Sequence, residues 1–86
     1  MKVEFSNHAL DRMTARGIIK EDVIAFLKNC DSIIVLDIET VVYSKLVVES
    51  NKTYLYRIFI NKTKKPALVV TVYKTSKIEK YGYKIQ

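Results

Sequence analysis

The chain has 86 residues, which is enough for one small domain and too few for two. Hydrophobic residues make up 49% of it, so an intrinsically disordered protein is excluded, and a single cysteine, Cys30, excludes an internal disulfide. With one histidine and one cysteine the chain lacks the ligands of a structural zinc site. No acidic cluster indicates another metal, and we expect no cofactor.

The apolar runs of the chain are short. None approaches the roughly 20 residues needed to span a bilayer, and the start, Met1 to Phe5, lacks the apolar segment of a signal peptide. We therefore expect a cytoplasmic protein that makes no membrane contact.

The net charge of +6 is distributed unevenly. Residues 1–50 carry six Lys/Arg and eight Asp/Glu, a net charge of −2, whereas residues 51–86 carry nine Lys/Arg and one Glu, a net charge of +8. The basic part also holds five of the six tyrosines. Cations interleaved with aromatic rings suit RNA, whose phosphates attract cations and whose bases stack on rings; the alternative is a solubilising lysine face.

Two helices are predicted first along the chain. Ser6 can cap the N-terminus of a helix over residues 6–16, and Gly17 stands where a helix commonly ends. A second helix is predicted over residues 20–29, where acidic residues favour the N-terminus and an apolar stripe follows. The link between them is short, so the two helices should form a hairpin or a bent pair.

Four strands are predicted next, over residues 32–38, 40–48, 53–60 and 67–73, because these segments are rich in β-branched and aromatic residues. Short connections favour an antiparallel meander. We therefore expect residues 1–86 to form a single α+β domain, in which two helices precede all strands and pack on one face of a four-stranded antiparallel sheet. The basic tail from Lys74 shows no assignable pattern.

The strongest candidate for a site is a helical stripe. His8, Arg12 and Arg16 are spaced four apart, so they stack on one face of the first helix. An acid or base that titrates near neutral pH, beside two guanidinium groups, suits a site for phosphate. The alternative is a solvated stripe with Asp11 as counter-charge.

A third arginine lies in the middle of a strand. Arg57 shares a strand face with Leu55 and Phe59, where a charge is costly unless it is paired or lies at the edge of a cleft. A carboxylate such as Asp37 or Glu39 is the alternative partner.

The last strand offers hydroxyl groups. Thr71 and Tyr73 project to one face of it, and together with Lys74 and Lys77 they could line a phosphate pocket. The alternative is that Thr and Tyr occur here only because they favour strands.

The segment FSNHALDRMTARGIIKEDV, residues 5–23, resembles the opening of an uncharacterised family of small bacterial domains with the pattern His-Ala-x-x-Arg-Met/Leu-x-x-Arg-Gly-Ile. The strand at residues 69–73 also resembles theirs. That family is similar to the RelE-type toxins and to the wider barnase–EndoU–colicin–RelE superfamily. The resemblance implies a RelE-like fold and a metal-independent ribonuclease site between helix and sheet, and the matching residues are His8, Arg12, Arg16, Thr71 and Tyr73. Lys20 departs from the pattern, because a helix-capping residue is expected there.

Our first hypothesis is a toxin-like ribonuclease in which the 2′-OH of RNA attacks the adjacent phosphorus. His8 would act as general base or acid, Arg12, Arg16 and Arg57 would stabilise charge on the phosphoryl oxygens, and Tyr73 would stack a base or donate a proton. Substrate-binding contacts would come from Thr71, Lys74 and Lys77. The partners would be RNA, free or on the ribosome, and an acidic antitoxin covering the basic part.

Two alternatives stay open. One is a non-catalytic module of the same fold that binds RNA or a protein, and the other is a domain kept for stability or assembly. The position of the helical stripe discriminates between the ribonuclease and the binding module. A cleft shared with Arg57 or Tyr73 favours catalysis, and open solvent favours binding.

Overall fold

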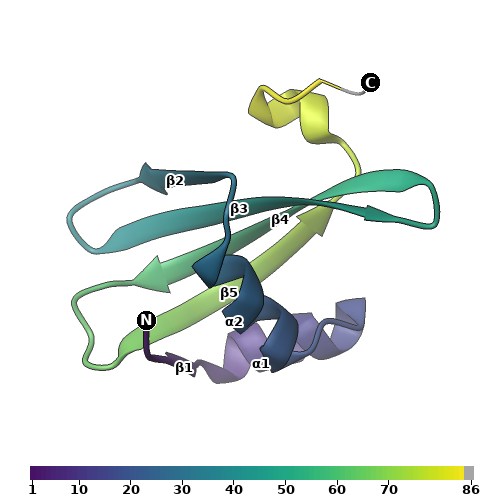
Figure 1. Ribbon diagram of the computed structural model, residues 1–86. Coiled ribbons are helices and arrows are strands. Elements are labelled where there is room, and N and C mark those ends of the chain that lie inside the picture. The colour runs from purple at the N-terminus through teal and green to yellow at the C-terminus, as the bar shows by residue number, and fades with distance from the viewer. Residues whose placement is uncertain (85–86) are drawn as a thin grey trace.

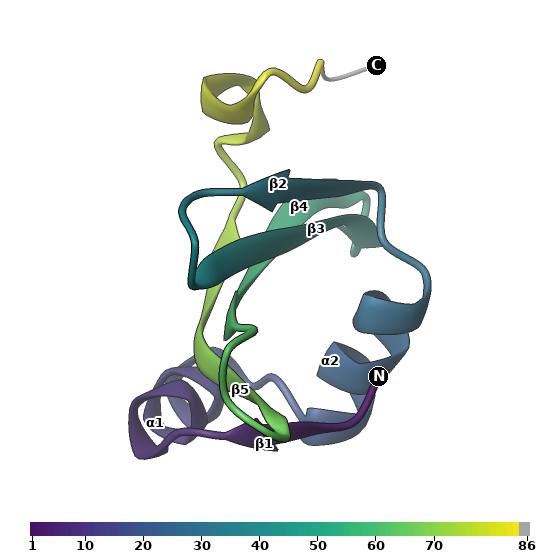
Figure 2. The same ribbon diagram turned by 90° about the vertical axis from the view of Figure 1, so that its left-hand side faces the viewer.

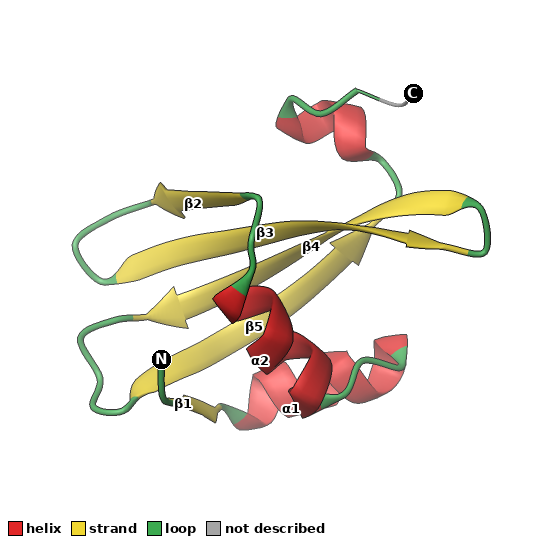
Figure 3. Ribbon diagram, in the orientation of Figure 1, coloured by secondary structure: helices red, strands yellow, loops and turns green. Residues whose placement is uncertain are grey.

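A computed structural model describes residues 1–84, which form a five-stranded sheet and two α-helices (Figures 1 and 3). In chain order the elements are β1 (Val3–Phe5), α1 (Asn7–Arg16), α2 (Lys20–Lys28), β2 (Ser32–Val35), β3 (Thr40–Glu49), β4 (Lys52–Asn61), β5 (Ala67–Thr75) and the 3₁₀ turn η1 (Ile78–Tyr81). The strands lie in the order β1-β5-β4-β3-β2. Within residues 1–84, no helix combines the length and the apolar character needed to cross a membrane.

The predicted four-stranded antiparallel sheet is wrong. A fifth strand, β1, precedes His8 and pairs in parallel with β5, so the sheet is mixed and one strand comes before both helices. The register sets Val3 against Ala67 and Phe5 against Val69. Three residues are too few to show an alternating pattern, and their partner lies more than 60 residues away along the chain. The other three strand pairs are antiparallel, as predicted.

The start of α1 is tied to β5 through Ser6. Its hydroxyl oxygen accepts the N–H of Ala9 at 3.0 Å, which confirms the predicted N-cap, and its hydroxyl donates to the carbonyl of Val70 at 2.8 Å. Its own N–H donates to the carbonyl of Val69 at 3.0 Å. The helix ends at Gly17, whose φ of 68° lies in the left-handed region that glycine adopts without strain. The bonds of Ser6 therefore fix the position of the first turn of α1, which carries His8.

One face of the sheet, called the covered face below, packs against α2. Tyr56, Ile58 and Ile60 of β4 point to this side and are almost completely buried. The ring of Phe26 on α2 lies 4.9 Å from that of Tyr56, measured between centroids. Figure 2 shows α2 and α1 on different sides of β5, yet buried residues of both helices belong to one hydrophobic cluster with this face of the sheet. The main hydrophobic core of the domain lies under α2.

The opposite face, called the cleft face below, carries the residues between those. Antiparallel register sets Arg57 of β4 beside Tyr73 of β5, and Phe59 beside Thr71. Side chains directly opposite one another in such a pair lie on the same side of the sheet. The turn η1 contacts β4, and Ile78 within it is only 1% exposed. The chain after β5 therefore folds back over part of the cleft face.

The first antiparallel strand is shorter than predicted. We expected residues 32–38, but β2 ends at Val35, because Asp37 forms a turn. One oxygen of its carboxylate accepts the N–H groups of Glu39 and Thr40 at 2.9 and 2.8 Å. These bonds hold the pKa of Asp37 below its ordinary value.

Candidate functional site

A cleft of about 410 Å³ lies between α1 and the cleft face of the sheet. Its walls come from four elements of the chain. The lining residues are His8, Arg12, Arg16, Arg57, Phe59, Thr71, Val72, Tyr73 and Tyr81. Six of the eight residues that the sequence singled out are thus gathered around one hollow, although they come from positions 8 to 73 of the chain.

The helix α1 divides its two sides between the core and the cleft. Ala9 and Met13 are buried in the main core at 0% and 2% exposure. The next residues round the helix, His8, Arg12 and Arg16, are exposed and line the cleft. Because the buried stripe anchors the helix against β5, the charged stripe lines the cleft while its side chains remain exposed.

Arg57 lies close to two aromatic rings. Its guanidinium carbon is 4.5 Å from the ring centroid of Tyr81 and 5.2 Å from that of Phe59. Among residues 1–84 it forms no ion pair, so the alternative pairing with Asp37 or Glu39 is not seen. Aromatic rings in contact with a guanidinium orient it without using its N–H donors. No carboxylate in the described part of the chain competes for those donors, so they can bind an anion in the cleft.

Two tyrosines meet at the rim of the cleft. The rings of Tyr73 and Tyr81 lie 6.5 Å apart in an edge-on arrangement, and Tyr73 is 41% exposed. Hydrogen bonding to Tyr81, and then to Thr75, lowers the pKa of the Tyr73 phenol, and the positive charges of Lys80 and Arg16 lower it further. Tyr73 is therefore a stronger acid than an ordinary tyrosine.

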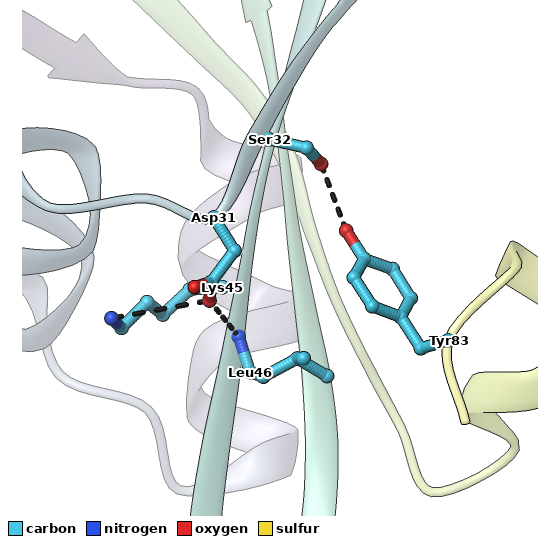
Figure 4. A network of polar contacts seen from close by, with 5 residues as sticks. All are labelled: Asp31, Ser32, Lys45, Leu46 and Tyr83. Atoms are coloured by element: carbon cyan, nitrogen blue, oxygen red, sulfur yellow. Dashed lines mark hydrogen bonds and ion pairs between the residues drawn. The ribbon is translucent and has the colours of Figure 1, made fainter. Parts of the chain in front are cut away.

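Tyr81 and Phe59 were not selected from the sequence as site residues. Phe59 was recognised as a face neighbour of Arg57, but Tyr81 lies in the tail that showed no periodic pattern. The tail is held in place by Tyr83, whose hydroxyl is 2.9 Å from the hydroxyl of Ser32 on β2 (Figure 4). The only sequence signal was the density of tyrosines after Lys77, which does not indicate where they fold.

Two predicted substrate contacts, Lys74 and Lys77, lie outside the cleft. Lys74 follows Tyr73 in β5 and so points to the other face, where its ammonium nitrogen is 2.7 Å from Glu49. The hydroxyl of Tyr56 donates to the second oxygen of the same carboxylate at 2.7 Å. Lys74 first, and then Tyr56, lowers the pKa of Glu49. Lys77 lines a neighbouring hollow instead.

No group of three or more His, Cys, Asp or Glu side chains that could hold a metal ion occurs among residues 1–84. The polar groups of the cleft are instead one imidazole, three guanidinium groups and three hydroxyls. This set supplies hydrogen-bond donors and positive charge to an anion, together with groups able to exchange protons.

Comparison with known proteins assigns the chain to a family. No curated protein and no solved structure matches the chain significantly. The model of a protein family described as a domain of unknown function (DUF4258) matches residues 5–77. The matched segment contains every residue that lines the cleft except Tyr81. Since the match extends over most of the 86 residues, the chain belongs to the DUF4258 family of domains of unknown function.

Proposed function

We propose that the protein is a ribonuclease that cleaves RNA through attack of the 2′-OH on the adjacent phosphorus. One observation carries the proposal: His8, the three arginines and Tyr73 line a single cleft, although they come from a helix and two strands. Titratable groups beside fixed cations are what cleavage of a phosphodiester requires. The family match makes no connection to RelE-type toxins, so the toxin-like character is part of this proposal and rests on the sequence resemblance.

In the proposed reaction His8 takes the proton from the 2′-OH, and the resulting oxygen bonds to phosphorus. The bond between phosphorus and the 5′-oxygen breaks, which leaves a 2′,3′-cyclic phosphate on one product and a 5′-OH on the other. Tyr73 gives its proton to the departing 5′-oxygen. The lowered pKa of Tyr73 suits this role, because proton donors work best when their pKa approaches the working pH.

The three arginines would bind the phosphoryl oxygens, on which negative charge builds up as the new bond forms. Arg57 suits this role best, because the rings of Phe59 and Tyr81 orient its guanidinium and no carboxylate among residues 1–84 competes for it. Preorganised donors of this kind contribute about 10² to 10³ in rate in other enzymes. Arg12 and Arg16 approach from the helix side of the cleft.

The test is incubation of the purified protein with total RNA, in the presence of a chelator of divalent metal ions. We expect cleavage that leaves 2′,3′-cyclic phosphate ends. His8→Ala and Arg12→Ala should each reduce it by about 10² or more, because each removes an acid/base group or a charge-stabilising group. Both positions are exposed on the helix, so thermal unfolding should change little.

The matched control is Lys62→Ala, which removes a cation from the loop between β4 and β5, outside the cleft. It should leave cleavage nearly unchanged. RNA binding without any cleavage by the wild type would favour the second candidate, a non-catalytic RNA-binding module. Loss of activity in step with loss of folding would make the helical stripe a structural feature.

A further inference from the structure

A second hollow of about 550 Å³ adjoins the cleft at the carboxyl end of β5. Arg16 and Tyr73 line both hollows, so the two share a wall. We call the second one the lysine groove. Its lining residues are Ala15, Arg16, Tyr54, Tyr73, Lys74, Thr75, Ser76, Lys77 and Lys80.

Among residues 1–84, the lysine groove is lined by cations and hydroxyls and by no carboxylate. Of its cations, Lys74 is engaged by Glu49 at 2.7 Å, with its side chain 20% exposed. Lys77 and Lys80 are exposed and form no ion pair among residues 1–84. Ammonium groups next to the hydroxyls of Thr75 and Ser76 are suitable donors for the oxygens of a phosphate.

The wall between the two hollows is aromatic. Tyr73 stands there, 41% exposed, with Tyr81 edge-on to it. An exposed ring between two cationic hollows offers a surface on which an unpaired base can stack. In a duplex the bases are already stacked on one another, so this arrangement suits a single strand.

We propose that the lysine groove binds the phosphate next to the one held in the cleft, so that the substrate is a single-stranded RNA with at least two consecutive phosphates. This inference rests on the proposed function and specifies its substrate class. The ammonium groups of Lys77 and Lys80 bind the second phosphate. A molecule with one phosphodiester would bind only in the cleft, and the lysine groove would add nothing to its affinity.

The loop between β4 and β5 supplies a matched control. Lys64 and Lys65 are exposed like Lys77 and Lys80, but they line neither hollow. The double variant K77Q/K80Q therefore removes two positive charges from the lysine groove. The double variant K64Q/K65Q removes two positive charges from a surface outside both hollows. If the groove is only a solvated lysine face, the two variants should behave alike.

The experiment measures the binding of 2′-O-methyl RNA probes, which cannot be cleaved because the attacking hydroxyl is blocked. A dinucleotide with one phosphate is compared with a trinucleotide with two. For the wild type and for K64Q/K65Q, the second phosphate should tighten binding about tenfold, as expected for charge-assisted hydrogen bonds. It should also steepen the plot of log affinity against log salt by about 0.7.

For K77Q/K80Q, both probes should bind equally well and with the same salt dependence, while the dinucleotide keeps its wild-type affinity. Thermal unfolding checks that the variant is folded. The proposal is overturned if K77Q/K80Q retains the tenfold gain, or if K64Q/K65Q loses it to the same extent. A double-stranded probe that binds as tightly as the single strand would also overturn it.

Binding of these probes does not depend on catalysis, so the two proposals fail separately. The expected binding pattern without cleavage of total RNA would overturn the ribonuclease and leave the second phosphate site standing. Cleavage that depends on His8, with no gain from the second phosphate, would overturn the site and leave the ribonuclease.

Discussion

Neighbouring residues of β4 point to opposite faces of the sheet, and the side chains on the two faces differ in polarity and burial. Ile58 and Ile60 point to the covered face, where α2 removes them from water. Arg57 and Phe59, each one residue away, point to the cleft face and are only partly buried. Since successive side chains of a strand alternate, one segment serves both a dry core and a polar cleft.

The comparison shows what each helix does. α2 lies over the sheet and seals it, as the contact between Phe26 and Tyr56 shows. α1 contacts β5, burying Ala9 and Met13 while holding its charged stripe beside the other face. Both helices therefore contribute to the core, but only α1 also forms a wall of the cleft. Variants on the two faces of the sheet should affect different properties.

The largest effect should come from the covered face. Ile58→Ala removes a side chain with 0% exposure and leaves a cavity under α2. The free energy of unfolding should fall by about 3 kcal/mol, within the usual range for such truncations. Urea unfolding at neutral pH measures it. A loss below about 1 kcal/mol would contradict a tightly packed covered face.

The next effect should come from the cleft face and should appear in activity. Arg57→Met keeps the aliphatic stem of the side chain but removes the guanidinium, so RNA cleavage should fall about 10²-fold. Stability should change by less than about 1 kcal/mol, because only the contacts with Phe59 and Tyr81 weaken.

Arg57→Lys sharpens this test. It retains the charge but not the planar fork of donors, and its cleavage rate should lie between those of the wild type and Arg57→Met. If both variants unfold as readily as Ile58→Ala, the two faces are not distinct in the way proposed.

A smaller effect is expected at the polar rim of the covered face. Tyr56→Phe removes the hydroxyl that donates to Glu49 at 2.7 Å and leaves the ring against Phe26. The free energy of unfolding should fall by about 1 kcal/mol, the usual net value of one hydrogen bond. RNA cleavage should be unchanged, since Tyr56 does not line the cleft.

The smallest effect concerns acid stability. Lys74, followed by Tyr56, holds the pKa of Glu49 below its ordinary value of 4.5, so the unfolded chain binds more protons than the folded chain in that region. Glu49 therefore stabilises the fold fully above about pH 4.5, and this contribution is lost as the pH falls through the folded pKa.

Glu49→Gln should flatten the decline of stability between about pH 5 and about pH 3. The Glu49 side chain is 39% exposed, so solvent screens the pair and the difference should stay below about 1 kcal/mol. Urea unfolding across this range measures it. An equally steep decline in the variant would assign the acid sensitivity to other carboxylates such as Asp37.

Local patterns predicted most of the elements. The capping residue Ser6, the terminal Gly17 and the alternation in β4 were all readable, because each depends on a few neighbouring residues. The same alternation indicated that Lys74 could not share a face with Tyr73. The prediction nevertheless placed Lys74 with Tyr73 in one phosphate pocket. In the structure only Tyr73 lines the cleft, and Lys74 pairs with Glu49.

The spacing of His8, Arg12 and Arg16 determined that these three side chains share one side of a helix, and strand alternation determined that Thr71 and Tyr73 share one face of a strand. Only the tertiary structure decided that these two sets, with Arg57, surround one cleft. That outcome depends on the pairing of β1 with β5, which fixes where α1 begins, and on the tail that brings Tyr81 over Arg57. Both are contacts between residues far apart in the chain, and no periodic pattern within a short segment encodes them.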